Sequence, residues 1–327
     1  MNRNLLLVSL SLLIWGAGEG LFIYFQPLYL QQLGADPLLI GQIYGAIGVA
    51  ITIAPIPVGY LSDLFGYRTF MWISWIVGTL SAAIIALADS LPLIVIGMVL
   101  YGFTGYFLEP MNSYITRVRG NLSVGRALTL CSGLFNIGAV LGPGLGGLIA
   151  EKLGLRTVYT LATFIFLVST VIILFVHKDP QNQDEKLNDD RPGRLLRNQG
   201  LLVLLGMTVI TAFALYLPQP LTANYLQNQQ GLSFQTIGYL GAVGSLGNAM
   251  IMLAMGNLKP RVGFIIGQFL TLIFTLLFLN GMSPIEFGFG YFFLGGYRLC
   301  RSLILAIGRP LVHPNQIGLT YGLIETA

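Results

Sequence analysis

The stretch Gly59-Tyr60-Leu61-Ser62-Asp63-Leu64-Phe65-Gly66-Tyr67-Arg68 lies between two long apolar runs of this chain. It places Asp63 and Arg68 at a point where one apolar run ends and the next begins almost at once. Such a junction between two membrane helices requires small residues where the helices approach, and paired charges at the water boundary. The stretch therefore predicts a short turn at the edge of a membrane that the chain crosses repeatedly.

The composition of the chain excludes an ordinary soluble domain. Its 327 residues are 55% hydrophobic and only 9% charged, whereas soluble proteins contain about 25% charged residues. A helix needs about 20 apolar residues to cross roughly 30 Å of hydrocarbon. Runs of this length recur, and they predict spans at residues 4–25, 40–60, 69–88, 92–115, 124–149, 156–176, 200–221, 236–256, 262–280 and 284–307. We expect an eleventh span to begin near residue 316 and to be cut off at residue 327.

One polar segment and an internal repeat divide the chain into two halves. Residues 178–198 are rich in Asp, Asn, Gln, Lys and Arg, and such a composition cannot bury a core. Tyr29-Leu30-Gln31-Gln32 is answered by Tyr225-Leu226-Gln227-Asn228, each shortly after an apolar span. We therefore predict an amino-terminal six-helix half (1–177), a cytoplasmic linker (178–198) and an incomplete carboxy-terminal half (199–327). The fold class is an all-α polytopic membrane protein.

The positions of Lys and Arg predict the orientation in the membrane. If the amino terminus is cytoplasmic, most of these residues fall in inside loops, and the outside loops hold only Lys152 and Arg156. We expect a multi-pass protein of the cell membrane, monomeric in the lipid bilayer. The net charge of +4 follows from this topology and does not indicate nucleic-acid binding.

The pattern Gly-x-Leu-x-Asp-x-x-Gly-x-Arg at residues 59–68 resembles the signature loop between the second and third helices of major facilitator superfamily transporters. The resemblance implies a gating latch, in which Asp63 contacts the start of helix eleven and a basic residue at the end of helix four. The alternative is a surface ion pair that contributes little. The equivalent loop of the second half, residues 256–261, lacks the Asp. The expected latch residues are Gly59, Asp63, Gly66, Arg68, Arg117 and Arg119.

A second motif lies in the fifth span, Gly138-Ala139-Val140-Leu141-Gly142-Pro143-Gly144-Leu145-Gly146-Gly147. Gly138 and Gly142 predict a flat face for close helix packing, and Pro143 removes a backbone hydrogen bond. The run resembles the helix-five motif of the drug:proton antiporter branch of this superfamily, which also occurs outside antiporters. The resemblance implies a bend that seals the periplasmic side. The residues concerned are Gly138, Gly142, Pro143, Gly146 and Gly147.

Charged residues inside the spans are candidates for proton coupling or substrate binding. Glu19 lies deep in the first span, where an ionised side chain costs about 3 kcal/mol by insertion scales. We expect it to face the bundle interior and to carry protons or contact substrate, with a structural hydrogen-bonded carboxyl as the equal alternative. Arg298 must find an anionic substrate, a backbone carbonyl or a carboxylate, for which Glu19, Glu109 and Glu325 are candidates.

Other polar residues are weaker candidates. Gln26 and Gln219 precede Pro27 and Pro220 at repeat-related positions. Packing or a position at the membrane interface explains any single one of the further cavity-lining candidates better. These candidates are Tyr24, Tyr101, Tyr106, Asn136, Tyr216, Gln268 and Tyr297.

The chain shows no phosphate loop, nucleophile triad or metal cluster, so we expect neither an enzyme nor a bound cofactor or metal. The resemblance implies alternating access driven by an ion gradient, with protons as the coupling ion. The helix-five motif favours export of drug-like compounds. Arg298, together with the absence of the arginine often seen in helix four of antiporters, favours uptake of a polar or anionic metabolite such as a sugar or organic acid.

Overall fold

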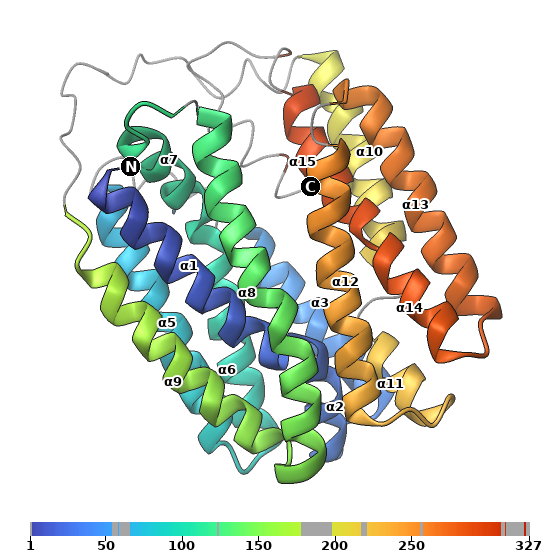
Figure 1. Ribbon diagram of the computed structural model, residues 1–327. Coiled ribbons are helices and arrows are strands. Elements are labelled where there is room, and N and C mark those ends of the chain that lie inside the picture. The colour runs from blue at the N-terminus through green and yellow to red at the C-terminus, as the bar shows by residue number, and fades with distance from the viewer. Residues whose placement is uncertain are drawn as a thin grey trace.

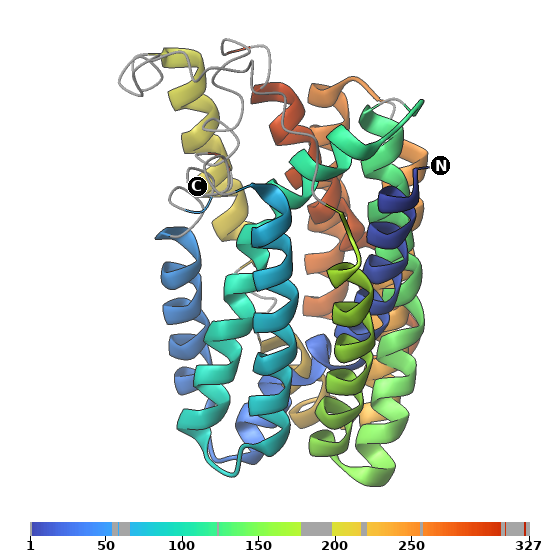
Figure 2. The same ribbon diagram turned by 90° about the vertical axis from the view of Figure 1, so that its left-hand side faces the viewer.

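The computed structural model describes residues 2–53, 58, 66–122, 124–177, 198–216, 221–255, 258–308, 311 and 324. Within these ranges every regular element is a helix. Figures 1 and 2 show the helices running roughly along one common axis, with the amino-terminal half beside the carboxy-terminal half. Of the residues in the predicted sites, Gly59, Asp63 and Gln219 lie outside the described ranges.

The amino-terminal half contains helices that follow the predicted spans to within a few residues. They are α1 (Arg3–Phe22), η1 (Ile23–Phe25), α2 (Gln26–Gln32), α3 (Pro37–Ile53), α5 (Tyr67–Leu87), α6 (Leu91–Phe103), η2 (Thr104–Phe107), α7 (Leu108–Val118), α8 (Val124–Leu153) and α9 (Leu155–Leu174). The carboxy-terminal half contains α10 (Gln199–Tyr216), α11 (Thr222–Asn228), α12 (Phe234–Met255), α13 (Pro260–Asn280), α14 (Pro284–Phe293) and α15 (Gly295–Gly308).

Three predicted spans are interrupted in the structure. The first passes through the 3₁₀ turn η1 just before Pro27, and the fourth passes through η2 just before Pro110. A proline has no N–H to donate to the carbonyl four residues before it, and its ring clashes with that carbonyl. For Pro27 and Pro110 these carbonyls belong to Ile23 in η1 and Tyr106 in η2, which accounts for the irregular backbone at both places. The tenth predicted span, residues 284–307, is covered by α14 and α15 with a one-residue interruption at Leu294. The helix ends at Phe293 and resumes at Gly295, where two adjacent glycines weaken the helix.

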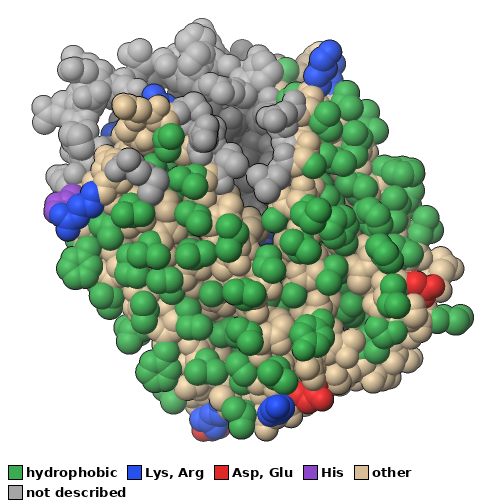
Figure 3. All heavy atoms as spheres, viewed as in Figure 1, with side chains coloured by type: hydrophobic (Ala, Val, Ile, Leu, Met, Phe, Trp, Pro, Cys, Tyr) green, Lys and Arg blue, Asp and Glu red, His purple; other side chains and the backbone are tan. Residues whose placement is uncertain are grey.

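The two ends of the bundle differ in charge. Figure 1 shows the starts of α1, α5 and α13 and the end of α7 at one end of the bundle. The basic residues at or next to these helix ends are Arg3, Arg68, Lys259, Arg117 and Arg119, and we call this the basic end. The other, opposite end carries the turns that join α5 to α6, α8 to α9, and α13 to α14. Between the ends, Figure 3 shows mainly hydrophobic side chains on the outer surface, with charged side chains confined to its margins.

Five helical stretches among the described residues are long and apolar enough to cross a membrane, including Arg3–Gln32 and Pro260–Asn280. Their outward-facing side chains are large and apolar, and Phe164 and Leu279 are 62% and 73% exposed. Exposed rings and aliphatic chains of this size are stable in lipid and unfavourable in water. The surface is therefore that of a protein embedded in a bilayer.

Hydroxyl groups join three helices inside the amino-terminal half. The Ser11 and Ser169 hydroxyls lie 2.8 Å apart and connect α1 to α9, while the Trp75 indole of α5 donates to Ser169 at 2.9 Å. A second hydroxyl pair, Thr79 and Thr170, connects α5 to α9 at 2.8 Å. Because lipid provides no hydrophobic force between helices, such contacts contribute to packing in membranes.

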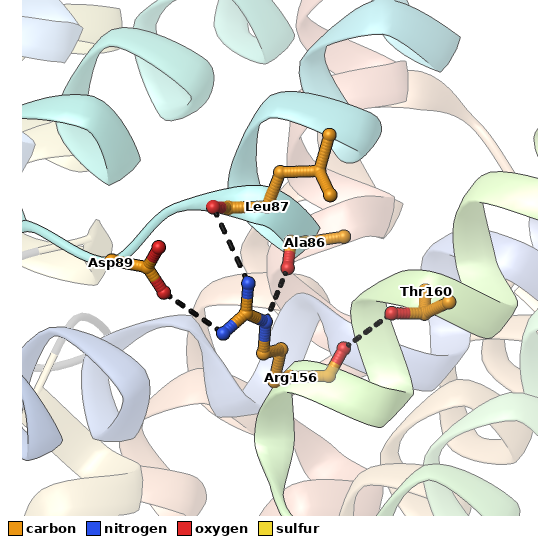
Figure 4. Close-up of polar contacts among 5 residues, drawn as sticks. All are labelled: Ala86, Leu87, Asp89, Arg156 and Thr160. Carbon is orange, nitrogen blue, oxygen red and sulfur yellow. Dashed lines mark hydrogen bonds and ion pairs between the residues drawn. The ribbon is translucent and has the colours of Figure 1, made fainter.

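Arg156, one of the two basic residues of the predicted outside loops, closes the turn between α5 and α6 (Figure 4). Its Nε donates to the carbonyl of Ala86 at 2.9 Å and its Nη1 lies 2.9 Å from Asp89 Oδ1. The ion pair is largely exposed and contributes little by itself. The bond to a carbonyl in the last turn of α5 satisfies a backbone group that the helix leaves open. This role accounts for a basic residue at the opposite end.

Candidate functional site

A cavity of about 320 Å³ lies between the two halves of the protein. Its walls come from α1, η1, α2, α3 and α8 of the first half and from α11, α12, α14 and α15 of the second. Among the residues that the structure describes, the carboxylate of Glu19 and the guanidinium of Arg298 line this cavity. Its amide groups belong to Gln26, Asn136 and Asn248, and its rings to Tyr24, Tyr44, Phe135, Tyr291 and Tyr297.

Glu19 reaches this cavity because the glycines beside it pack against other helices. A Cβ on Gly18 would lie 2.7 Å from the ring of Phe166 in α9, and one on Gly20 would lie 2.9 Å from the carbonyl oxygen of Ala139 in α8. These contacts fix the rotation of α1, so that the side chain of Glu19 is the one left facing the interior. Glu19 lies in the cavity wall, and its role in proton coupling or substrate binding stays a prediction.

A hydrogen bond and an aromatic cluster hold the carboxylate of Glu19. The Tyr101 hydroxyl of α6 donates to Glu19 Oε2 at 2.7 Å. Below it, Trp15 stacks on Phe166 with ring centroids 4.0 Å apart, and Tyr101 lies parallel to Phe166 at 6.0 Å. Rings exclude water from one side of the carboxylate while the cavity leaves the other side open. Glu19 therefore has a neutral donor, Tyr101, on one side and the cavity on the other.

Arg298 approaches the same cavity from the second half. It lies in the first turns of α15, after the break at Leu294, and its side chain is exposed to the cavity. Its positive charge acts electrostatically on Glu19, one of the three carboxylates considered from the sequence. The site thus combines opposite charges from different halves of the chain.

Of the other polar residues considered from the sequence, the structure places Gln26 at the cavity but does not describe the side chains of Glu109 and Arg301. Gln26 is buried in the cavity wall and accepts a hydrogen bond from the Tyr44 hydroxyl at 3.3 Å. Glu109 lies in the first turn of α7, and its side chain is outside what the structure describes. The same holds for the side chain of Arg301.

The glycine motif of α8 has two distinct packing faces, and α8 continues through Pro143 as one helix. Gly138, Gly142 and Gly146, spaced by four, face α1, where any added Cβ would overlap the backbone around Leu13, Gly20 and Leu21. Pro143 and Gly147, also spaced by four, face α12 of the second half, and they meet the backbone of Gly238 and Phe234. One helix therefore packs within its own half and against the other half at once.

Two polar contacts connect the halves at the opposite end. Gln31 of α2 exchanges hydrogen bonds with Asn228 of α11, each at 3.1 Å, and also accepts a hydrogen bond from Asn224. The carboxylate of Glu151, near the end of α8, accepts a hydrogen bond from the backbone N–H of Gln235 at 2.9 Å, in the first turn of α12. We call the group Gln31, Asn224 and Asn228 the amide clasp. Together with the α8–α12 contact it joins the two halves at the opposite end.

The described latch residues lie at the basic end. Gly66 begins the turn into α5 with φ of +89°, a conformation that strains residues with a side chain. The guanidinium of Arg68 lies 4.3 Å from the ring centroid of Trp72, and that of Arg117 lies 4.8 Å from the ring centroid of Tyr67. Arg119 is partly exposed one residue beyond the end of α7. The latch itself stays a prediction, because Asp63 is outside the described residues.

The chain matches the family model for the Major Facilitator Superfamily over residues 8–327. It is 27% identical over 313 residues to the multi-drug resistance efflux pump PmrA of Streptococcus pneumoniae, covering 89% of this chain and 77% of that protein. It is 28% identical over 311 residues to the multidrug resistance protein MdtG of Escherichia coli, covering 90% and 76%.

Solved structures share the fold. A mutant of the nucleoside transporter NupG superposes with a TM-score of 0.79 at 12% identity, covering 99% of this chain and 87% of that one. An inward-facing, unoccupied bacterial homolog of the human lysosomal transporter Spinster superposes with a TM-score of 0.73 at 15% identity, covering 99% and 78%. The human organic anion transporter MFSD10 superposes with a TM-score of 0.66 at 17% identity, covering 99% and 89%. The chain belongs to the major facilitator superfamily and is a multi-pass membrane transporter of small molecules, not an enzyme.

Proposed function

We propose that this transporter exports amphipathic, drug-like compounds across the cell membrane in exchange for protons. The observation that supports the proposal is the carboxylate of Glu19 in an aromatic-lined cavity between the two halves. A proton and a cationic group of the substrate compete for this carboxylate, and the competition couples the two movements. The names of PmrA and MdtG, two relatives of this chain, describe multidrug resistance proteins and support export.

The proposed mechanism is alternating access around the cavity. The halves, residues 1–177 and 199–327 joined by the linker 178–198, rock against each other in a monomer. The contacts of α8 with α12 and the amide clasp fit a state that is closed at the opposite end. Closure at the basic end would employ the latch of Gly59, Asp63, Gly66 and Arg68 with Arg117 and Arg119 as candidate partners.

The orientation that we propose places the basic end, and with it the amino terminus, in the cytoplasm. Arg3, Arg68, Arg117 and Lys259 lie there, and loops rich in Lys and Arg remain on the cytoplasmic side. In this orientation the state that is closed at the opposite end binds and releases substrate on the cytoplasmic side.

A second candidate function is proton-coupled uptake of a polar or anionic metabolite. The observation that favours it is Arg298, which brings a permanent positive charge into the cavity. The solved structures of a nucleoside transporter and an organic anion transporter fit this alternative.

Purified protein in proteoliposomes separates the two candidates. With a pH gradient imposed at zero membrane potential, one measures accumulation of a panel of aromatic dyes and of a panel of sugars and organic acids. Proton-driven movement of the dyes alone supports export, and proton-driven movement of the metabolites alone contradicts it. Liposomes without protein provide the background for permeation through lipid.

The amide clasp gives a prediction about closure at the opposite end. We expect Gln31→Ala to remove the hydrogen bonds from Asn224 and Asn228, and with them about 1–3 kcal/mol of the free energy that favours the closed state. The cavity then becomes more accessible from the opposite side. The measurement is the labelling rate of an S245C variant by a membrane-impermeant maleimide, in the presence and absence of Gln31→Ala. The control is Gln32→Ala, which changes the exposed neighbour. Equal labelling of both variants would contradict a role for the clasp in closure.

A further inference from the structure

We propose that residues 147–156 form a second gating latch, an inverted copy of the stretch at residues 59–68, in which Glu151 holds the start of α12 and closes the opposite end. The inference rests on the proposed function only through its mechanism, since a latch requires halves that open and close. It assigns a role in gating to a segment outside the cavity, and this role does not depend on which compound is transported.

The sequence contains its most distinctive stretch twice. Residues 147–156 read Gly147-Leu148-Ile149-Ala150-Glu151-Lys152-Leu153-Gly154-Leu155-Arg156. Like residues 59–68, they have glycine, then leucine or isoleucine, an acidic residue, glycine and arginine at the first, third, fifth, eighth and tenth positions. The earlier stretch joins the second predicted span to the third, and the later one joins the fifth to the sixth. Two three-helix units of opposite orientation, nested in one half, place such loops at equivalent positions.

Where both stretches are described, they form the same turn at opposite ends of the bundle. Gly66 precedes α5 with φ of +89°, and Gly154 precedes α9 with φ of +83°. In each case the arginine, Arg68 or Arg156, is the second residue of the helix that follows. Figure 1 shows the start of α5 at the basic end and the turn from α8 to α9 at the opposite end. The second turn therefore repeats the first with its direction along the bundle reversed.

At the opposite end the second stretch contacts the other half of the protein. Glu151 Oε2 accepts a hydrogen bond of 2.9 Å from the backbone N–H of Gln235, the second residue of α12. The N–H groups in the first turn of a helix have no partner within the helix and form the positive end of its dipole, so a carboxylate is a favourable acceptor there. One turn earlier on α8, Gly147 lies so close to α12 that an added Cβ would be 3.0 Å from Gln235 Cα. The glycine thus makes room for the start of α12, and the carboxylate binds it.

The arginine of the second stretch has a separate role within its own half. Arg156 Nη1 lies 2.9 Å from Asp89 Oδ1, and its Nε donates to the carbonyl of Ala86. These contacts fix the turn against the end of α5, so that the carboxylate of Glu151 meets α12 in the same position whenever the halves close. A group that is held in place before it binds loses less conformational freedom on binding.

The two stretches act at opposite ends and therefore in alternate states. In the structure Glu151 is bonded to α12, so the second latch is closed. When the halves separate along α8 and α12, this bond breaks and both groups gain water. The stretch at residues 59–68, with Asp63 as its acidic residue, then closes the basic end. Removal of either acid should favour the state that the other acid holds.

The experiment measures the opening of the opposite end directly. The probe is S245C in the cavity wall, labelled in intact cells by a membrane-impermeant maleimide, which reaches the opposite end in the orientation proposed above. We expect E151A to speed this labelling about three- to tenfold, the effect of losing one charge-assisted hydrogen bond at a helix start. E151Q should have a smaller effect, because its amide oxygen still accepts the hydrogen bond but carries no charge. D63N should slow the labelling.

Glu286→Ala is the matched control. Glu286 Oε2 accepts hydrogen bonds of 2.8 Å and 3.0 Å from the backbone N–H groups of Met282 and Ser283 at the start of α14. It is therefore also a carboxylate at a helix start of the opposite end, but its contacts lie within one half. E286A should leave the labelling rate of S245C unchanged. The protein without S245C gives the background, since Cys131 and Cys300 are buried.

The outcomes separate the inference from the mechanism on which it rests. If Q31A speeds labelling while E151A and E151Q do not, the opposite end opens without Glu151, so the inference is wrong and alternating access stands. Equal acceleration by E151A and E286A would also contradict the latch. If E151A and D63N both speed labelling, the latches do not alternate, because latches at opposite ends must shift the equilibrium in opposite directions. If neither Q31A nor E151A changes labelling, the halves do not open at this end and the mechanism is wrong as well.

Discussion

Replacing Glu19 with glutamine should abolish proton-driven transport while leaving a folded protein that still lets substrate move down its own gradient. The amide keeps the size of the side chain and still accepts the hydrogen bond that Tyr101 donates to Glu19 Oε2 at 2.7 Å, but it cannot bind and release a proton. At zero potential, a gradient of one pH unit supports about a tenfold accumulation for an exchange of one proton per substrate. In E19Q the substrate should reach the same concentration on both sides of the membrane.

The measurement is dye accumulation in proteoliposomes at a fixed pH gradient with the potential clamped at zero. Glu286→Gln is the matched control. Glu286 is exposed at the opposite end, where it closes a capping box with Ser283 at the start of α14, and glutamine preserves that motif. The control should behave as the native protein does. If E19Q also accumulates dye to the native level, Glu19 has a structural role and the coupling group lies elsewhere.

Substitution of Tyr101, the donor to Glu19, should slow proton-coupled transport without abolishing it. Tyr101→Phe removes the hydroxyl that holds the carboxylate and keeps the ring that packs beside Phe166. Glu19 remains available for protons, so coupling should persist with a lower rate. Complete loss of coupling would indicate that the tyrosine itself, rather than Glu19, exchanges the proton.

The parts of the fold that the sequence could predict are those that depend on neighbours along the chain. Apolar runs gave the spans because a bilayer demands about 20 apolar residues in succession. The loop around Gly66 could be recognised because its requirements are local: a glycine with positive φ and charges at the membrane edge. Glu19 stood out for the same kind of reason, since an acidic residue within an apolar run is costly unless it serves a purpose.

The parts that it could not predict depend on contacts between distant segments. Glu19 and Arg298 were each proposed as site residues, and Glu19 was one of three candidate carboxylates for Arg298. Their common cavity follows only from the packing of α1 and α15 around it. The amide clasp was missed entirely, although Gln31 and Asn228 lie in the two copies of the internal repeat. That repeat was a signal for their pairing, because parallel halves place equivalent helix ends near each other.

The break between α14 and α15 was missed for a different reason. Gly295 and Gly296 occur in an apolar run where glycine is common, so their presence did not mark the end of a helix. The structure gives their purpose: a Cβ on Gly295 would lie 2.9 Å from the carbonyl oxygen of Gly247 in α12, and one on Gly296 would lie 2.7 Å from the side chain of Leu270 in α13. Close packing on two sides, rather than a turn, accounts for this glycine pair.

The two glycine faces of α8 should respond differently to the same substitution. Gly138→Val places a bulky side chain against the backbone of α1, within the amino-terminal half. We expect it to cost about 1–3 kcal/mol or more of folding free energy, because neither backbone can yield without disturbing the half. Gly147→Val, nine residues further along, instead meets the backbone around Phe234 of the other half. Since the halves can separate at this contact, Gly147→Val should raise the free energy of the closed state and leave the free energy of unfolding of each half nearly unchanged.

Two measurements distinguish these effects. Gly138→Val should lower the melting temperature in detergent by several degrees and reduce the yield of folded protein. Gly147→Val should melt close to the native temperature, yet transport should fall at least tenfold and S245C should become accessible from the opposite side. Gly133→Ala, on the same helix with no atom within 4 Å of the added Cβ, should change neither property. A large loss of stability in Gly147→Val would show that the α8–α12 contact holds the fold together and that the halves do not separate along it. A motif of five small residues would then serve packing alone, and the seal of the cavity would depend on the amide clasp and Glu151.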